Sequence, residues 1–385
     1  MKWQYSVNQI IEQHWQNIQQ SPLFTSFDLY HLNQLRKCRT AALGGHINAC
    51  DQCGHFQIAY NSCRNRHCPS CQGLKREEWI LQQEAILLPV PYFHVVFTLP
   101  AELNGLCIAH PRLLYSLLFK CAKDTINAFA KDPKFLGAKT GITTVLHTWG
   151  QNLSLHPHLH CIIPGGGIDR QGKWVTTRSE GKYLFPRNAM RKVFKGKFLA
   201  GLKDLASKEA IVFPNQLKEQ LYRKKWVVYA KRPFANPEAV IEYLGRYTHK
   251  VAISNFRIKK LTPTHVTFEW KDYRTGGNKK LMTLPVLEFL RRFCLHFLPD
   301  RFQRIRHYGI LSSRGRHSYI PLLQQQLGIQ ITPPSKEQLR TKALTRLKVS
   351  TTCPCCQKGT MRAILPFGRD GPPDESYIFQ YIAKA

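Results

Sequence analysis

Residues 151–163 read QNLSLHPHLHCII, and this stretch decides the fold of the middle of the chain. Its second half predicts a strand over 155–163, where successive side chains point to opposite faces. His158 and His160 therefore project together from one face, while Leu159 points to the other. Two imidazoles placed in this way supply two ligands of a divalent-metal site. A pair of purely structural histidines is the alternative.

A third ligand is needed for such a site, with positions left open for a substrate phosphate. Gln151 lies seven residues before His158, at the end of a strand predicted over 142–149, and is our candidate. His156 competes with it, but Pro157 intervenes and is expected to turn that side chain away. We therefore predict Mg²⁺ or Mn²⁺ bound by Gln151 and the two histidines.

Further along, residues 237–250 read PEAVIEYLGRYTHK and predict a helix. Asn236 is a suitable cap, and Pro237 is favourable in a first turn. The apolar side chains share one arc at about 100° per residue, and Tyr243 and Tyr247 lie at its edge. Because these tyrosines are four residues apart, their Cβ atoms are expected about 5–6 Å from each other.

A basic arc neighbours the two tyrosines and contains Arg246 and Lys250, our candidates for contacts with DNA phosphates. A phenol at this boundary can keep its ring packed while its hydroxyl faces a cleft. Its ordinary pKa of about 10 means that it needs a nearby cation or base to act as a nucleophile. The alternative is that Tyr243 and Tyr247 are packing residues of an amphipathic helix.

The N-terminal part contains a dense group of cysteines and histidines. Two Cys-x-x-Cys pairs predict one tetrahedral zinc site, because the two-residue gap lets a tight turn aim both sulfurs at one ion. These ligands are Cys50, Cys53, Cys68 and Cys71. The interleaved residues predict a second zinc ion in a cross-braced arrangement; they are Cys38, His46, Cys63 and His67. Buried free thiols are the alternative, and they explain the paired spacing poorly.

Two further features extend this pattern. Arg64 and Arg66 lie between the predicted ligands, and they either touch a DNA backbone phosphate or are solvated loop residues. Cys353 and Cys356, with Cys355 beside them, resemble half of a zinc ribbon, but the sequence shows no evident second pair.

The composition limits the partners of this protein. Of 385 residues, 56 are basic and 24 acidic, which gives a formal net charge of +32, and 43% are apolar. A globular chain with this charge is expected to bind a polyanion, either nucleic acid or an anionic membrane surface. Membrane binding is disfavoured, because the sequence contains no 18-residue apolar run and no signal peptide. The thirteen cysteines are spaced for metal rather than for disulfides, which favours a reducing cytoplasm.

The remaining periodic stretches predict a mixture of helices and strands. Helices are expected over 1–35, 73–88, 102–130 and 286–298, strands from Tyr92 and over 225–230, and a hairpin-like region over 251–274. Residues 170–222 are expected to be irregular or helical, and the C-terminal part shows few periodic stretches. We divide the chain into an N-terminal helical and zinc-binding domain (1–88), a middle domain (89–300) and a basic C-terminal region (301–385).

Three basic stretches are candidates for lining a channel for single-stranded nucleic acid, namely 187–197, 222–225 and 301–316. Aromatic side chains near them are candidates for stacking on bases, namely Trp174, Trp226 and Tyr308. Solvated surface is the alternative for each of them.

Several motifs occur in one order along the chain, namely CRT, LGGH, CDQCG, YNSCRNRHCPSCQ, WGQNLSLHPHLHC, EYLGRYTHKVAISN and RIRHYGILSSRGR. Together they resemble the two-tyrosine HUH transposases of insertion-sequence family ninety-one, over about Cys38 to Cys356. The resemblance implies an α+β fold, with an N-terminal Cys/His zinc domain and an HUH-nuclease palm over residues 89–300. Such a palm is an antiparallel sheet with helices on one face.

The resemblance also implies roles for individual residues. His158 and His160 match the metal ligands, and Tyr243 and Tyr247 match the paired nucleophiles. Cys50, Cys53, Cys68 and Cys71 match the zinc-binding head. Gln151 as third metal ligand is inferred from the position of such ligands in related replication initiators.

The implied activity is cleavage and rejoining of single-stranded DNA at transposon ends and target, through a 5′-phosphotyrosine, in rolling-circle transposition. The protein would then act at the nucleoid of a bacterial cell. A rolling-circle replication initiator would use the same chemistry, and a non-catalytic zinc-dependent DNA-binding protein would explain the charge and cysteines alone. A carboxylate-triad transposase would need three converging acids, for which Asp169, Asp272 and Glu288 are available.

Overall fold

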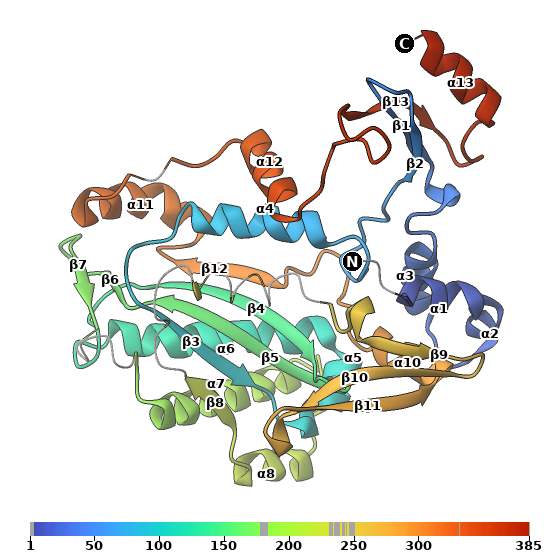
Figure 1. The fold of residues 1–385 in the computed structure, drawn as a ribbon. Coiled ribbons are helices and arrows are strands. Elements are labelled where there is room, and N and C mark those ends of the chain that lie inside the picture. Colours follow the sequence, from blue (N-terminus) through green and yellow to red (C-terminus); the bar gives the residue numbers. More distant parts are fainter. Residues whose placement is uncertain are drawn as a thin grey trace. The chain divides into compact units, whose positions relative to one another are not determined.

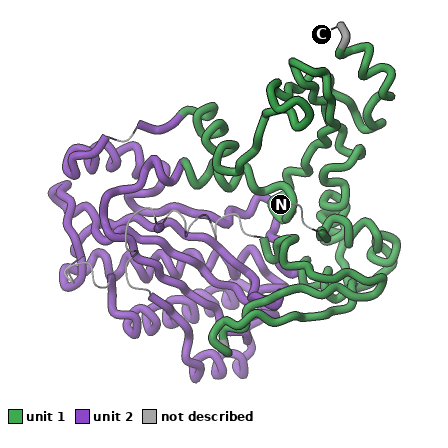
Figure 2. Tube along the Cα trace, in the orientation of Figure 1, with its two compact units in different colours: residues 1–81, 249–294, 335–385 green, residues 82–248, 295–334 purple. Residues whose placement is uncertain are grey.

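The computed structural model describes residues 4–177, 184–230, 234, 239–240, 243, 245, 251–330 and 332–384. The chain divides into two compact units, which Figure 2 colours separately. Unit 1 consists of residues 1–81, 249–294 and 335–385, and unit 2 of residues 82–248 and 295–334. These units do not coincide with the three consecutive segments expected from the sequence, because the C-terminal segment returns to pair with the N-terminal one.

Unit 2 is built on a five-stranded antiparallel sheet with the strand order β12-β4-β5-β3-β8 (Figure 1). The strands are β3 (Tyr92–Thr98), β4 (Gly141–Trp149), β5 (Leu155–Pro164), β8 (Val227–Ala230) and β12 (Ile305–Gly309). The four strands predicted from the sequence are confirmed as β3, β4, β5 and β8. The edge strand β12 was not predicted, because it lies in a basic stretch without clear alternation.

The two faces of this sheet differ in chemistry. One face presents Phe93, Phe97 and Leu159, each at most 1% exposed, to the main hydrophobic core. The other face carries four histidines from three adjacent strands, and we call it the histidine face. They are His94 on β3, His147 on β4, and His158 and His160 on β5. A sheet with one apolar and one polar face packs helices against the first and leaves the second for other contacts.

Two long helices supply the core that covers the apolar face. α6 (Pro111–Lys131) begins with a proline in its first turn and buries an apolar stripe, and α7 (Arg187–Ser207) buries a row that includes Phe194 and Phe198. The helix predicted over 102–130 is confirmed, although His110 interrupts it between α5 and α6. Among the described residues, the other elements of unit 2 are η2 (Ala101–Leu103), α5 (Asn104–Ala109), β6 (Gly166–Ile168), β7 (Trp174–Thr176), α8 (Asn215–Arg223) and α11 (Ser313–Leu327).

Trp226 is a core residue rather than a platform for DNA bases. Its side chain is 2% exposed, and its indole N–H donates to the carbonyl oxygen of Leu221 at 3.1 Å. The ring packs on Phe194 and Phe198, on the same side as buried Val228. The base-stacking prediction for Trp226 is therefore wrong, because the start of β8 turns this side chain toward α7. Trp174 and Tyr308 are half-buried, and their stacking role stays a prediction.

Unit 1 contains two three-stranded antiparallel sheets, ordered β13-β1-β2 and β11-β10-β9. Their strands are β1 (Gly45–Cys50), β2 (Phe56–Tyr60), β9 (Ile258–Leu261), β10 (His265–Asp272), β11 (Asn278–Pro285) and β13 (Met361–Phe367). The helices are α1 (Val7–Gln13), α2 (Trp15–Gln20), α3 (Ser26–Arg36), α10 (Val286–Cys294), α12 (Lys336–Arg346) and α13 (Glu375–Lys384). Short 3₁₀ turns are η1 (Ala41–Leu43), η3 (Asn255–Arg257) and η4 (Tyr273–Thr275). α4 (Gly73–Glu84) runs across the division between the units.

The predicted α+β class, with antiparallel sheets and helices, is confirmed. The helices expected over 1–35, 73–88 and 286–298 are present, and the hairpin-like region forms β9 and β10. The C-terminal part is more regular than expected, because β13 pairs with β1 from Gly45↔Phe367 to Cys50↔Met361. No helix among the described residues has the length and apolar character needed to cross a membrane.

Candidate active site and metal centres

Strand register brings three histidines together on the histidine face. His147 on β4 is the direct cross-strand partner of His158 on β5, and His160 follows two residues later on the same side. One ring nitrogen from each of the three lies within 4.8 Å of the others. His147 and His160 are buried, and His158 is partly exposed. The cluster therefore brings three converging nitrogens together on the histidine face, with His158 the most exposed of the three.

The hydrogen bond of His158 fixes its tautomer. Its Nδ1 lies 2.7 Å from the carbonyl oxygen of His156, which can only accept, so Nδ1 carries the proton. Nε2 is then left with a lone pair, the form that binds a cation. Burial lowers the pKa of His158 to about 4, so the ring is neutral at physiological pH.

The hydroxyl of Tyr243 lies against this cluster. Tyr243 is helical, and its oxygen is 3.0 Å from Nε2 and 3.2 Å from Nδ1 of His94. The same oxygen is 3.4 Å from Nδ1 of His160. His94 is 2% exposed, stacks on the His160 ring, and joins Nδ1 of His160 through its Nε2 at 2.9 Å. One tyrosine and two histidines thus form a connected hydrogen-bonding group.

The other predicted residues of this site lie as follows. Gln151 is half-buried in the turn after β4, and the ring of His156 is exposed, 5.2 Å from that of His158. Tyr247, Arg246 and Lys250 lie outside the described residues.

Sequence reasoning missed His147 and His94. The signal for His147 was present, because strands 142–149 and 155–163 are joined by a short turn and must pair as a hairpin. Pairing Trp149 with Leu155 brings His147 opposite His158 after one irregular step. His94 lies in a strand that was predicted, but its partner strand could not be read from the sequence.

A basic group lies further along the same face of β4. His307 on β12 accepts a hydrogen bond from Arg316 at 3.1 Å, and the hydroxyl of Thr143 lies 3.0 Å from the same ring nitrogen. Arg316 is half-buried and also donates to Gln83 at 3.2 Å. Burial, together with the Arg316 charge, lowers the pKa of His307 to about 4, so the guanidinium is the cation of this group.

The cysteines gather in two groups of four. One group contains Cys38, Cys63, Cys68 and Cys71, and the other contains Cys50, Cys53, Cys353 and Cys356, with all sulfurs of a group within 4.8 Å of one another. The structure therefore does not bring together the two Cys-x-x-Cys pairs that the sequence grouped. His46 lies on β1, and His67 is buried with its ring 5.6 Å from that of His31; neither belongs to a group.

The β1–β2 hairpin explains this regrouping. Cys50 and Cys53 lie at its tip, whereas Cys38 and Cys63 flank its base, where the Cys63 amide donates to the Cys38 sulfur at 3.4 Å. β1 spans six residues, so tip and base are separated by about 17 Å. One ion could not bind ligands at both ends. The choice of partners was thus decided by the hairpin and not by the spacing of the cysteines.

The geometry of the first group suits zinc. Tetrahedral sulfurs at about 2.3 Å from an ion lie about 3.8 Å apart, and the Cys63 and Cys71 sulfurs are 3.7 Å apart. Hydrogen bonds from neighbouring cysteines hold the pKa of the Cys71 thiol far below its usual range, and the bond with Cys38 has the largest effect. Arg64 follows Cys63 in the left-handed region, with φ 52°, and is one of the two predicted phosphate contacts. The other, Arg66, lies on the same loop.

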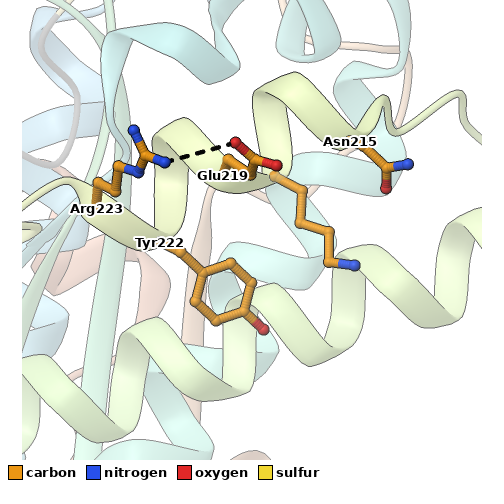
Figure 3. A pocket seen from close by; sticks show the side chains of 5 residues that line it. Asn215, Glu219, Tyr222 and Arg223 are labelled. Carbon is orange, nitrogen blue, oxygen red and sulfur yellow. Dashed lines mark ion pairs between the residues drawn. The ribbon is translucent and has the colours of Figure 1, made fainter.

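A shallow hollow on α8 is lined by residues of that helix alone (Figure 3); they are Asn215, Lys218, Glu219, Tyr222 and Arg223. Arg223 forms an ion pair with Glu219 at 3.8 Å, and both side chains are mostly exposed. None of the histidines or cysteines described above lines it. We therefore assign no function to this hollow.

Comparisons with known proteins agree on one class. A family model described as "Putative transposase" matches residues 141–318, and one described as "Transposase zinc-binding domain" matches residues 10–99. The chain is 43% identical to "Putative transposase y4qJ" of Sinorhizobium fredii, over 89% of this chain and 90% of the relative. It is 28% identical to the transposase for insertion sequence element IS801 of Pseudomonas savastanoi pv. phaseolicola, over 83% of this chain and 79% of the relative. No solved structure matches.

Proposed function

Because this chain belongs to the insertion-sequence 91 family of transposases, with an N-terminal zinc-binding domain, we propose that it cleaves and rejoins single-stranded DNA through a 5′-phosphotyrosine. The observation that carries this proposal is the Tyr243 hydroxyl, 3.0 Å from His94 and 3.4 Å from His160. A nucleophile, a base and metal-binding nitrogens at one place are what a tyrosine nuclease needs.

The histidine cluster fits a divalent cation. Ligand atoms about 2.1 Å from one ion lie about 3–4 Å apart, and the three ring nitrogens already lie within 4.8 Å of one another. His158 offers its Nε2 in the neutral form. His147, His158 and His160 would hold the ion; Gln151 as a ligand stays a prediction. When bound, Mg²⁺ or Mn²⁺ would polarise the scissile phosphate and stabilise charge on its oxygens.

The side chains around Tyr243 supply the rest of the chemistry. Whichever ring nitrogen of His94 is unprotonated can accept the phenol proton, because both lie within 3.2 Å of the hydroxyl. The phenolate oxygen attacks phosphorus, a Tyr–O–P bond forms, and the bond to the 3′ oxygen breaks. The products are a 5′-phosphotyrosine and a 3′ oxygen that takes up a proton. Because the phosphodiester is conserved, this 3′ end can later reverse the reaction on another strand without ATP.

Two tyrosines would allow two strands to be held in turn. We infer that Tyr243 and Tyr247 divide the donor and target strands, as rolling-circle transposition requires, with Arg64, Arg66, Arg246 and Lys250 contacting phosphates. A replication initiator would use the same cleavage chemistry, and the transposase relatives favour transposition over it.

The experiment is incubation of the protein with single-stranded DNA of transposon ends and Mn²⁺, followed by denaturing electrophoresis for a covalent adduct. Tyr243→Phe and Tyr247→Phe are compared singly and together. Tyr273→Phe, on the exposed turn η4, is the matched control and should form the adduct at the wild-type level. Wild-type adduct yield in the double variant would exclude both tyrosines and with them the proposal. Binding without any adduct from the wild-type protein would favour a non-catalytic DNA-binding role.

The carboxylate-triad mechanism finds little support. Asp169 accepts backbone amides of its own turn, from Gln171 and Lys173, and Asp272 pairs with Lys280 at 2.8 Å. The Glu288 carboxylate is held by Arg291 and Arg292, and hydrogen bonding, chiefly from Arg291, lowers its pKa to about 2. Among the described residues these three acids form no metal-binding group.

A further inference from the structure

Two Cys-x-x-Cys pairs from opposite ends of the chain meet within unit 1. Cys50 lies 3.7 Å from Cys356 and Cys53 lies 3.6 Å from Cys353, measured between sulfurs. All four sulfurs are within 4.8 Å of one another. Two sulfurs bound to one tetrahedral zinc ion are expected to lie about 3.8 Å apart. The half zinc ribbon at the C-terminus therefore finds its second pair some 300 residues earlier in the sequence.

The two pairs share one backbone conformation. In the first, the Gln52 amide donates to the Cys50 sulfur at 3.4 Å; in the second, the Cys355 amide donates to the Cys353 sulfur at 3.4 Å. Each pair also closes its turn with a backbone hydrogen bond. The Gly54 amide donates to the Cys50 carbonyl at 3.2 Å, and the Gln357 amide donates to the Cys353 carbonyl at 3.0 Å.

The residue after each pair is also alike. Gly54 has φ 67° and Gln357 has φ 56°, so both adopt the left-handed region. For Gln357 this conformation is unfavourable, and surrounding structure must hold it in place. Two unrelated stretches that fold into the same amide-to-sulfur turn form two matched halves of a site for one cation.

Hydrogen bonds between the two segments hold the second pair close to the first. Thr360 donates its amide to the Asp51 carboxylate at 2.8 Å, and Asp51 donates its own amide to the Thr360 carbonyl at 3.2 Å. Gly359 passes so close to Cys50 that an added Cβ would lie 2.3 Å from its sulfur. The next residues form β13, which pairs with β1. The approach of the sulfurs is thus built by the fold on both sides.

We propose that Cys50, Cys53, Cys353 and Cys356 bind one zinc ion, distinct from the ion of the Cys38 group, which fastens the C-terminal segment to the N-terminal head. The matched zinc-binding domain covers residues 10–99 and so contains only half of these ligands. The proposal does not depend on the tyrosine nuclease mechanism, because it concerns cysteines of unit 1 alone.

Zinc content of the purified full-length protein tests the proposal. Inductively coupled plasma mass spectrometry should find two zinc ions per chain, one for each cysteine group. Cys353→Ser with Cys356→Ser should halve the zinc content. The control is Cys355→Ser, which changes the exposed cysteine between them and should keep both ions. Unchanged zinc in the double serine variant overturns the proposal.

A glycine variant separates loss of ligands from loss of site geometry. Gly359→Val keeps all four cysteines but places a side chain where the Cys50 sulfur lies, and should also halve the zinc content. Gly368→Val is the matched control, because a Cβ there meets no atom within 4 Å. Far-ultraviolet circular dichroism of both variants should match that of the wild type. Full zinc content in Gly359→Val contradicts the proposed geometry.

Thiol counting distinguishes zinc from disulfides between the same cysteines. The denatured, unreduced protein should show all thirteen thiols after zinc is removed. Four missing thiols, mapped to these positions, overturn the proposal. A chelator should also speed proteolytic removal of the C-terminal segment of the wild type, whereas the double serine variant should be cut at the fast rate with or without it.

Discussion

The histidine cluster and the two cysteine groups show two ways of assembling a candidate metal site. The histidines lie on neighbouring strands, where backbone pairing fixes which side chains meet, as His147 meets His158. The cysteines lie on loops and at a hairpin tip, where their spacing in the sequence alone leaves the choice of partners open. Strand pairing therefore positions the side chains of a site before an ion binds, whereas a site on loops depends on its ion for stability.

The largest effect should follow from removing a ligand on the sheet. We expect His160→Ala to lower adduct formation by about 10²–10³-fold or more, because charge on the phosphate loses its stabilisation. Zinc content and melting temperature should stay close to the wild type. His156→Ala, which changes the exposed neighbouring histidine, is the control and should retain activity. A His160→Ala protein with normal adduct yield would falsify the role of the cluster.

His94→Asn should reduce the cleavage rate by about 10²-fold, because the phenol of Tyr243 loses its proton acceptor. Cleavage rates measured from pH 5 to 10 should then rise steadily with pH, since hydroxide must remove the phenol proton. A purely structural role for His94 would instead lower the rate equally at every pH. DNA binding, measured by fluorescence anisotropy, should be unchanged.

Removing a ligand from a loop site should act on stability first. We expect Cys68→Ser to release the zinc ion of its group and to lower the melting temperature by at least about 5 °C, because binding and folding are coupled there. Differential scanning calorimetry and zinc analysis of the same sample measure both. A melting temperature equal to that of the wild type would mean that the loops are ordered without the ion.

The smallest effect concerns a buried histidine beside the cluster. His296 is 4% exposed, donates to the Leu153 carbonyl at 3.2 Å, and burial lowers its pKa to about 4. An unfolded histidine takes up a proton near pH 6.5, so the contribution of His296 to stability should fall as pH drops from 6.5 toward 4, by at most about 3 kcal/mol.

Urea unfolding at several pH values checks this. His296→Gln should reduce the dependence between pH 6.5 and 4, and His317→Gln, at an exposed position, should leave it as in the wild type. The opposite sign, a gain in stability on acidification that depends on His296, would contradict neutral burial.

Much of the sheet could be predicted from residue patterns. Alternation identified β3, β4, β5 and β8 and placed His158 and His160 on one face, because side-chain direction in a strand depends only on position. The edge strand β12 and the partner of His94 could not be found in this way. They depend on which strands become neighbours, and that is decided by packing across more than 60 residues of sequence.

The sequence by itself determined which residue types are available for each candidate site, since its local spacing pairs the cysteines, places two histidines on one face of a strand and repeats tyrosine after four residues. Only the tertiary structure decided the partners. Cys50 and Cys53 meet Cys353 and Cys356 because β13 returns to β1, and the Tyr243 hydroxyl meets His94 on the histidine face across about 150 residues of sequence. Sequence patterns describe only residues that are close along the chain, whereas these side-chain contacts depend on burial and strand pairing between distant segments.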